Sequence, residues 1–355
     1  MLDDIIQDDI MRICKEHSDL LKAFENSTLL ISGGGGFLGA YLLDVINYCN
    51  EKLFLKPCKA ICIENFITGL PDRIKHLENN ANITIINKDV SKPLEIDIRP
   101  DYIIHCAGIA SPTVYRKFPI ETIEVNVMGL KNLLDLAKNS QVKSFLYFST
   151  SEIYGNPTAE NIPTPETYNG NVSCTGPRAC YDESKRLGET LCVNYCSQYG
   201  IPIKIVRPFN VFGPGLRLDD RRVIPDYFMD AFNNKKIIIL SDGKPSRSFC
   251  YIADATVGFI KALLSEYQGE AFNIGNDEIE ISMLDLAKKV ADIVDDVEIE
   301  YQESLEKNYL TDNPQRRCPD LTKSKKLLDY MPSIKLEEGL KRMKQWYINQ
   351  YNINL

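Results

Sequence analysis

From Thr28 onwards, short apolar or β-branched runs alternate with segments of helical periodicity. The runs are TLLIS (28–32), AICIE (60–64), ITIINKDV (83–90), YIIHCAG (102–108), SFLYFST (144–150) and IKIVRPF (203–209). Strands that are apolar almost throughout are typical of a parallel sheet covered by helices on both faces. We therefore expect an α/β chain built on a Rossmann-type, doubly wound parallel sheet.

The alternation stops near residue 210, which suggests a division of the chain. Beyond it come loops rich in Gly, Pro and charge, then short helices and strands, and a final amphipathic segment over 336–351. A chain of 355 residues exceeds the size at which one core usually stops growing. We predict an N-terminal helical extension over 1–27, a Rossmann domain over 28–209, and a smaller lobe mainly over 210–355 that binds substrate and crosses back to the first domain.

The composition narrows the classes of partner. A net charge of −8 gives no basic surface for nucleic acid, so no such partner is expected. Eleven cysteines without a CxxC pair, together with only three histidines, predict reduced thiols and no metal site. The N-terminal segment begins acidic and lacks a long apolar run, so we expect no signal peptide, no membrane anchor and a cytoplasmic location.

A glycine-rich turn follows the first expected strand. In SGGGGFLGAYLL, Gly33, Gly36 and Gly39 stand three residues apart and open a helix. This spacing permits a tight turn, close approach of backbone N–H groups to a pyrophosphate, and close packing of helix on strand. Glu64 ends the second strand, where a carboxylate can bind a ribose 2′-hydroxyl and repel the 2′-phosphate of NADP, so NAD is the predicted cofactor. The predicted cofactor-binding residues are Gly33, Gly36, Phe37, Leu38, Gly39, Glu64, Asn65, Asp89, Val90, Ala107, Tyr181 and Lys185.

Two further segments carry reactive side chains. Thr150, Ser151 and Glu152 follow the fifth strand, and Tyr181 and Lys185 are four residues apart, on one face of an expected helix. A tyrosine near a lysine ammonium and an oxidised nicotinamide should have a lowered pKa and can take the proton of a sugar hydroxyl. Tyr-x-x-x-Lys alone is common on solvated helices, but beside a dinucleotide turn the catalytic interpretation is favoured.

These motifs resemble the NAD-dependent epimerase/dehydratase group of extended short-chain dehydrogenases/reductases. The resemblance runs from about Thr28 to the C-terminal helix. Within the group, STSEIYG, GPRACYDESKR, RPFNVFGP, SRSFCYIAD and RRCPD are most similar to the UDP-glucuronate decarboxylases.

The resemblance implies roles for individual residues. Tyr181 would be the base, and Thr150 would bind the sugar hydroxyl. Lys185 would lower the pKa of Tyr181 and bind a ribose. Ser151, Glu152 and Arg317 complete the predicted catalytic set, with Arg317 near a sugar carboxylate, although Arg316 could serve instead. The predicted substrate-binding residues are Ser111, Tyr115, Asn210, Val223, Arg247 and Arg317.

The implied reaction decarboxylates UDP-glucuronate to UDP-xylose. Oxidation at C4 makes a β-keto acid, loss of carbon dioxide follows, and the same cofactor reduces the keto-pentose. The implied assembly is a homodimer through a four-helix bundle, formed by the helix after Asn126 and the one that begins near Tyr181.

Other functions stay open. A 4-epimerase needs only the oxidation and a rotation of the keto-sugar, but it usually lacks an acid like Glu152. A 4,6-dehydratase usually has Asp where this chain has Ser151. The chain also differs from the decarboxylases at Glu64, Arg116, Lys117 and Cys318, and it has two more residues than expected between Glu152 and Tyr181. An NAD-binding sensor or scaffold without catalysis is the alternative from another class, and the intact pair of Tyr181 and Lys185 is evidence against it.

Overall fold

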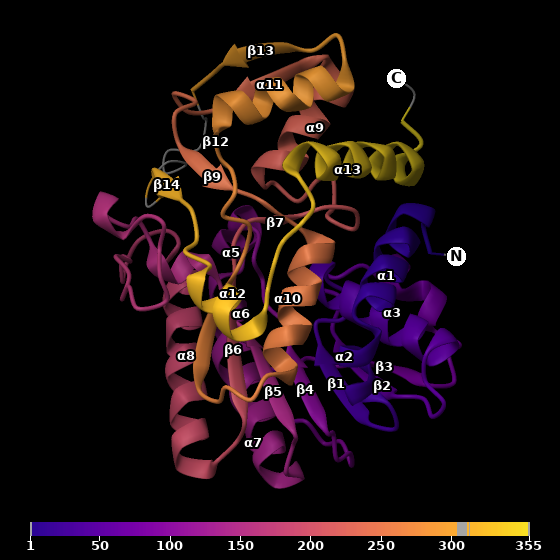
Figure 1. Cartoon of the computed structure of the whole chain (residues 1–355). Helices are drawn as coiled ribbons and strands as arrows, with labels where there is room; N and C mark the ends of the chain where they lie inside the picture. The colour runs from indigo at the N-terminus through magenta and orange to yellow at the C-terminus, as the bar shows by residue number, and fades with distance from the viewer. Residues whose placement is uncertain (1, 304–310, 312, 354–355) are drawn as a thin grey trace.

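The core of the molecule is one parallel sheet. The computed structural model describes residues 2–303, 311 and 313–353, and within them seven strands pair in the order β11-β6-β5-β4-β1-β2-β3 (Figure 1). The strands are β11 (Glu270–Ile274), β6 (Ile203–Pro208), β5 (Ser144–Phe148), β4 (Tyr102–His105), β1 (Thr28–Ser32), β2 (Lys59–Glu64) and β3 (Ile83–Asn87). The predicted α/β, doubly wound fold is confirmed. The strand order reverses between β1 and β4, which is where ligands bind in such sheets.

Six of the seven strands coincide with the apolar runs of the sequence. The seventh, β11, comes from the second half of the chain and pairs with β6, with Asn273 opposite Arg207. Since Ser32 of β1 is opposite both Ile63 of β2 and His105 of β4, these strands end at the same edge of the sheet. Side chains that follow the strands therefore gather at that edge.

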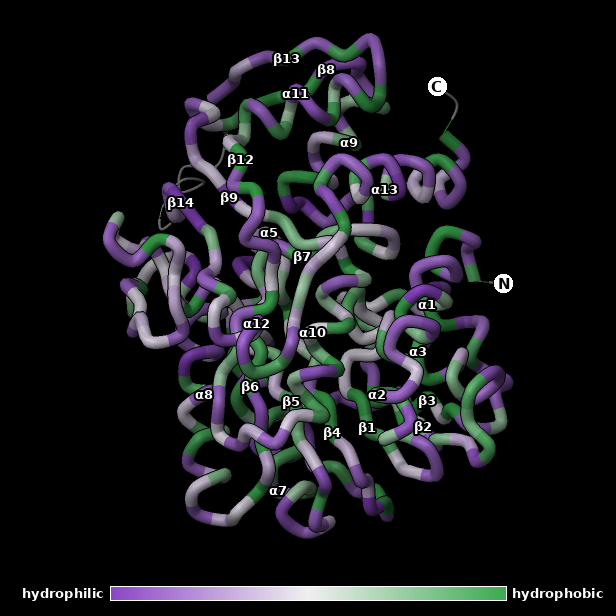
Figure 2. The backbone as a smooth tube through the Cα atoms, viewed as in Figure 1, coloured by the Kyte–Doolittle hydropathy of each residue, from purple (hydrophilic) through white to green (hydrophobic). Residues whose placement is uncertain are grey.

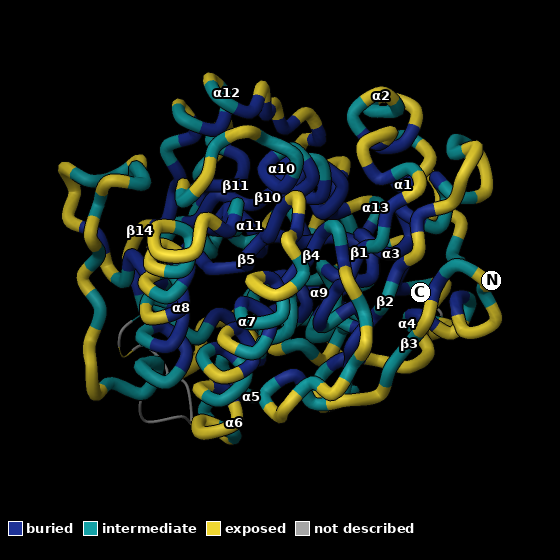
Figure 3. Tube along the Cα trace, turned by 90° about the horizontal axis from the view of Figure 1, so that it is seen from below, coloured by how far each residue is buried: buried dark blue, intermediate teal, exposed yellow. Residues whose placement is uncertain are grey.

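Helices cover both faces of the sheet. On one face, α3 (Phe37–Lys52) and α10 (Ile252–Leu264) pack on the strands, and on the other lie α7 (Leu130–Ser140) and α8 (Ala179–Tyr199). Hydrophobic residues gather along the strands, and exposed segments lie towards the rim of the molecule (Figures 2 and 3). The strands are apolar in sequence because both of their faces are buried.

The N-terminal segment folds onto this body as α1 (Asp4–Glu16), α2 (Ser18–Leu21) and η1 (Lys22–Phe24). The apolar face of α1 is buried, and its Asp9 accepts hydrogen bonds from Tyr41 of α3 and from Tyr251. Arg342 of the C-terminal helix also pairs with Asp9 at 2.9 Å. The helix α1 thus joins the sheet domain to the C-terminal part of the chain.

Most of the remaining chain forms a smaller unit above the carboxyl edge of the sheet (Figure 1). Its elements are β7 (Val211–Phe212), α9 (Val223–Asn234), β8 (Lys236–Ile239), β9 (Ser246–Ser248), β10 (Cys250–Tyr251), β12 (Glu280–Ser282), α11 (Met283–Val294), β13 (Glu298–Tyr301), β14 (Arg316–Arg317) and α13 (Leu336–Tyr351). After β9, the chain returns to the sheet through α10 and β11, and α12 (Thr322–Leu328) packs on β11.

Several short elements lie between the strands in sequence. They are α4 (Pro71–Ile74), η2 (Lys75–Leu77), α5 (Pro112–Lys117), α6 (Pro119–Ile123), η3 (Glu124–Gly129), η4 (Ser151–Tyr154) and η5 (Ala159–Asn161). Among the helices that the structure describes, none is both long and apolar enough to cross a membrane.

Candidate active site

The glycine-rich turn between β1 and α3 leaves no room for side chains. Gly33 has a φ of 76°, and a Cβ there would lie 2.6 Å from Cα of Ala107. A Cβ on Gly39 would lie 2.3 Å from the carbonyl oxygen of Gly33. Gly36 precedes the first residue of α3 and lines a cavity at the carboxyl edge. The backbone at this helix N-terminus is therefore open to an anionic ligand such as a pyrophosphate.

Most of the predicted cofactor-binding residues line this cavity. It is bordered by Gly33, Gly36, Glu64, Asn65, Asp89, Val90 and Ala107. The carboxylate of Glu64 accepts hydrogen bonds from the backbone N–H groups of Gly35, Asn65 and Phe66, which fixes its position. Phe37 and Leu38 begin α3 and do not line the cavity.

Tyr181 and Lys185 lie in the first turns of α8, both buried. Nζ of Lys185 lies 5.9 Å from the centroid of the Tyr181 ring and donates a hydrogen bond of 2.8 Å to the carbonyl of Phe148 at the end of β5. A Cβ on Gly108, which borders the cofactor cavity, would lie 3.3 Å from the same nitrogen. The ammonium of Lys185 thus lies near both the Tyr181 ring and Gly108 at the border of the cavity.

The environment of Tyr181 differs from our expectation. Burial is the largest effect and raises its pKa to about 12, against the opposing effect of a hydrogen bond with Thr150. Burial also lowers the pKa of Lys185 to about 8. Among the groups of this chain, desolvation therefore outweighs any acidifying effect of the lysine on the phenol.

The segment after β5 carries the polar triplet. Thr150 caps η4 by accepting a 3.2 Å hydrogen bond from the backbone N–H of Glu152. Its hydroxyl also reaches Tyr181. Ser151 is buried within η4. The structure therefore brings Thr150, Glu152 and Tyr181 together at the edge where the strands end.

The carboxylate of Glu152 lies between two arginines. Its Oε2 pairs with Arg178, and its Oε1 pairs with Arg317. Burial opposes ionisation, but Arg178 and Arg317 outweigh it and hold the pKa of Glu152 at about 2. Nε of Arg178 also lies 3.7 Å from Asp182. Glu152 is consequently ionised at neutral pH in this arrangement.

The strand β14 decides between the two neighbouring arginines. Arg317 is buried and faces Glu152, whereas Arg316 points outward to Glu280, 2.7 Å away. Successive side chains of a strand point to opposite faces, so only one of the pair can enter the site.

Arg247 lies beside Arg317 on the paired strand β9. It donates to the backbone carbonyls of Ser246, Pro314 and Gln315 and to Oδ1 of Asn313. Burial, and then the charge of Arg317, lower its pKa to about 9. Arg247 is thus a buried cation held mainly by uncharged oxygens, and it is not part of a surface salt bridge.

A second cavity, of about 730 Å³, extends from this cluster into the smaller unit. Tyr115, Glu152, Asn210, Val223, Arg247 and Arg317 line it, together with Arg178 and Arg222. The rings of Tyr115 and Tyr181 are stacked, with their centroids 5.2 Å apart. The buried hydroxyl of Tyr115 has no hydrogen-bond partner within the described residues. Ser111 does not line the cavity and donates to the carbonyl of Asp220.

Sequence reasoning missed three residues of this site, one of which is Arg222 in the wall of the second cavity. Arg178 precedes Tyr181 by three residues, a helical spacing that could have placed the two on one face. Asn126 is buried in η3 and donates to Ser184 of α8, while its Oδ1 lies 3.1 Å from where a Cβ on Gly108 would be. The sequence around Asn126 gave no signal beyond an amphipathic helix.

Comparison with known proteins agrees with this geometry. A profile described as "NAD dependent epimerase/dehydratase family" matches residues 29–275. The chain belongs to this family. Membership confirms the predicted family and the NAD cofactor, and it identifies the chain as an NAD-dependent enzyme of the class that modifies nucleotide sugars.

Three similar proteins illustrate the likeness. UDP-glucuronic acid decarboxylase 5 of Arabidopsis thaliana is 39% identical over 90% of this chain and 89% of its own length. The structure of the epimerase Mth375 from Methanothermobacter thermautotrophicus superposes with a TM-score of 0.81, at 25% identity, covering 96% of this chain and 97% of that one. UDP-glucuronic acid 4-epimerase from Bacillus cereus, solved with UDP-glucuronic acid and NAD, has a TM-score of 0.75 at 26% identity and covers 91% of this chain and 99% of its own.

The first cavity fits the family's cofactor. The turn at Gly33 and Gly39 would be filled by any Cβ, and the N-terminus of α3 is open beside it. The carboxylate of Glu64 stands at the end of β2, where the ribose of a dinucleotide lies in such sheets.

Proposed function

We propose that this enzyme decarboxylates UDP-glucuronate to UDP-xylose through a 4-keto intermediate. The observation that carries the proposal is the group formed by Arg178, Arg247 and Arg317 around Glu152, in the wall of the cavity that also holds Tyr115. Guanidinium groups are well suited to binding carboxylate and phosphate. A buried site with more cations than carboxylates favours an anionic sugar.

The first cavity supports binding of NAD across the carboxyl edge. We assign the pyrophosphate to the turn at Gly33 and Gly36, and the adenosine ribose to Glu64. Asp89 and Val90 would border the adenine, with Lys185 at the other ribose. The chemistry that NAD supplies when bound is the reversible oxidation of a sugar carbon.

Tyr181 and Thr150 act on the sugar hydroxyl at C4 in this proposal. Thr150, already hydrogen-bonded to Tyr181, orients the hydroxyl, and the phenolate of Tyr181 takes its proton. Because burial raises the pKa of Tyr181 to about 12, a cation beside the ring is needed to favour the phenolate. Lys185, whose Nζ lies 5.9 Å from the ring centroid, and Arg222, whose charge lowers the pKa of Tyr181, are the candidates among the described residues.

Loss of carbon dioxide follows from the chemistry of the substrate. A ketone at C4 makes the uronic acid a β-keto acid, so the electrons of the breaking bond enter the ketone as an enolate. Arg317 and Arg178 hold the carboxylate in place before it leaves. The enolate carbon then takes up a proton from water, which leaves a ketone at C4. When a hydride is returned to C4, which the bound cofactor would supply, Tyr181 gives its proton back to the oxygen at C4.

The charge state of Glu152 argues against a 4,6-dehydratase. A dehydratase must protonate a departing hydroxyl, and the pKa of Glu152 is held at about 2 by its arginines. Ser151, at the position where dehydratases usually have Asp, cannot supply this acid. An ionised Glu152 instead orders the two guanidinium groups that would meet a substrate carboxylate.

A uronate 4-epimerase is the second candidate, because the same arginines suit its substrate. The test is to incubate the purified protein with NAD and UDP-glucuronate and to analyse the gas and the nucleotide sugars. We expect carbon dioxide and UDP-xylose. Retention of the carboxylate with inversion at C4 would favour the epimerase, and the absence of any product would overturn both.

We also propose the predicted organisation of the chain. It has the extension over 1–27, the NAD-binding domain over 28–209 and the substrate lobe over 210–355, with α10 and β11 as the part that crosses back. We further propose a homodimer through a four-helix bundle, formed in each subunit by α8 and by the helical run that contains and follows Asn126 (η3 and α7), with α6 beside it. Six exposed large hydrophobic side chains on α6, η3 and α8 support this interface: Ile120, Ile123, Met128, Leu187, Val193 and Tyr199.

A further inference from the structure

Asn273 is a buried residue that joins the two segments carrying Glu152 and Arg317. Its Oδ1 accepts a 2.7 Å hydrogen bond from the hydroxyl of Tyr154, two residues after Glu152. Its Nδ2 donates to the carbonyl of Asp320, three residues after Arg317, at 3.1 Å, and to the carbonyl of Thr164 at 2.9 Å. The amide of Asn273 in β11 is therefore hydrogen-bonded both to the segment that carries Glu152 and to the segment that carries Arg317.

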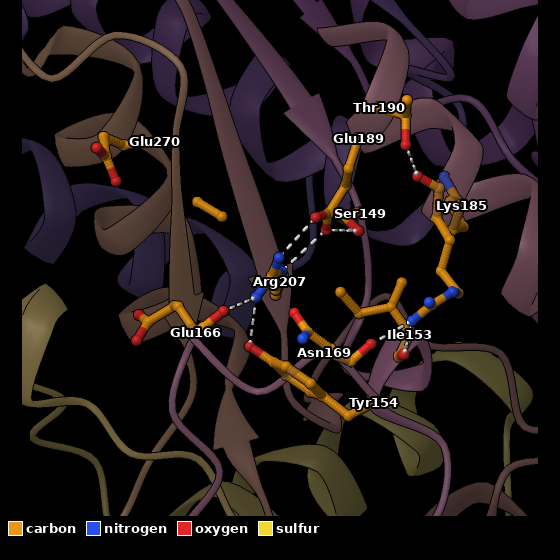
Figure 4. Close-up of polar contacts among 12 residues, drawn as sticks. Ser149, Ile153, Tyr154, Glu166, Asn169, Lys185, Glu189, Thr190, Arg207 and Glu270 are labelled. Carbon is orange, nitrogen blue, oxygen red and sulfur yellow. Dashed lines mark hydrogen bonds and ion pairs between the residues drawn. The ribbon is translucent and has the colours of Figure 1, made fainter. Parts of the chain in front are cut away.

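A buried ion pair also contacts the segment that carries Glu152. Arg207 of β6 forms two hydrogen bonds with the carboxylate of Glu189, of 2.9 and 2.6 Å, and donates to the hydroxyl of Tyr154 at 2.7 Å (Figure 4). Glu189 also accepts a hydrogen bond from Ser149. Residues 149 and 154 are thus both tied to this ion pair, and the triplet Thr150, Ser151 and Glu152 lies between them.

The hydroxyl of Tyr154 takes part in two hydrogen bonds, one as acceptor and one as donor. It accepts from Arg207 and donates to Asn273, so the side chain has a single favourable orientation. Buried polar networks in which the members are paired are rigid, because each broken bond would leave an unpaired group in a low-dielectric interior. None of Tyr154, Asn273 and Arg207 lines either cavity, so their effect on a substrate must be indirect.

We propose that Tyr154 and Asn273 are positioning residues that set the separation of Glu152 and Arg317, with the Arg207–Glu189 pair as their anchor. The inference rests on the proposed roles of Glu152 and Arg317. It predicts that loss of one hydroxyl, outside both cavities, changes the geometry of the site.

The first test is Tyr154→Phe, which keeps the ring and removes only the hydroxyl. The matched control is Tyr251→Phe, because that buried hydroxyl also lies between charged partners, Asp9 and Arg342. We expect Tyr154→Phe to lower kcat with UDP-glucuronate roughly tenfold and to change KM far less, since a small misplacement of reacting groups is costly. We expect Tyr251→Phe to lose comparable stability in urea unfolding and to keep its kcat.

A double-mutant cycle separates positioning from general damage. In a Glu152→Gln background, Tyr154→Phe should cause no further loss of kcat, because the pair that it positions is already broken. An additive loss, or a kcat unchanged by Tyr154→Phe, would overturn the inference. A Glu152→Gln variant with full turnover would overturn the proposed role of Glu152 as well.

A crystal structure of Tyr154→Phe gives an answer that does not depend on activity. We expect the contact between Glu152 and Arg317 to be lengthened or broken. If that contact is unchanged, the inference is wrong even where the wild type decarboxylates UDP-glucuronate. If the contact is broken but the wild type releases no carbon dioxide, the positioning stands and the proposed reaction fails.

Discussion

At the scale of the residue, burial shifts the pKa values of Tyr181 and Lys185 more than neighbouring charges do. Tyr181 and Lys185 share one helix face, as predicted, yet each is shifted towards its neutral form by desolvation. Glu152 is the opposite case, because two arginines contact its carboxylate directly and overcome burial. The difference is contact: ion pairs offset desolvation only when the partners touch.

Replacing Lys185 by Met should stabilise the folded protein at neutral pH and abolish turnover. The pKa of Lys185 is about 8 in the folded chain and 10.5 in the reference state, so between these values only the unfolded chain holds the proton. Stability of the wild type should therefore rise with pH across this window, by roughly 3 kcal/mol. Urea unfolding of both proteins between pH 7 and 10.5 should show the advantage of Lys185→Met shrinking. The exposed Lys56→Met is the control, and an advantage that does not vary with pH would contradict the argument.

At the scale of the element, the two-residue strand β14 directs two adjacent arginines to opposite faces. Pairing with β9 turns Arg317 towards Glu152 and Arg316 towards Glu280. The sequence RRCPD does not tell which of the two arginines enters the site. Side chains of a strand alternate between two faces, and which face each takes is known only when the partner strand is known.

Lysine substitutions at the two positions should have unequal effects. Arg317→Lys keeps the charge but loses the fork that can bind Glu152 and a carboxylate together, so we expect kcat/KM for UDP-glucuronate to fall about a hundredfold. Arg316→Lys should remain near the wild type, because its pair with Glu280 is half-exposed. Equal activity of the two variants would contradict the proposed role of Arg317.

The same elements show what sequence reasoning could reach. Six strands and the long helices α3, α8 and α13 follow from local periodicity, which a single segment contains in itself. The strand β11 was not predicted, since the run EAFNI lies in the second half of the chain and becomes the sheet's edge only by pairing with β6. Arg178 and Asn273 escaped for a related reason, because their partners are distant in sequence.

At the scale of the whole molecule, the N-terminal helix α1 contacts the C-terminal helix α13. Asp9 of α1 pairs with Arg342 of α13, and both contact Tyr251 at the start of the return to the sheet. These three residues line neither of the two cavities. The proposed partner subunit would lie on the face of the sheet that α8 covers, where α8 exposes Leu187 and Val193.

The proposed dimer can be tested with one charge on that surface. Leu187 of α8 is 47% exposed, and a glutamate there would be buried without a counter-ion when two copies meet through α8 and α6. We expect sedimentation analysis to give the mass of two chains for the wild type and of one chain for Leu187→Glu at micromolar concentration. Leu55, 95% exposed and remote from α8, provides the control: Leu55→Glu should stay dimeric.

Since Tyr181 and Lys185 lie on the buried side of the same helix, monomeric Leu187→Glu should also bind NAD more weakly if pairing stiffens α8. A wild type that sediments as one chain would exclude the dimer, and an unchanged mass for Leu187→Glu would move the interface elsewhere.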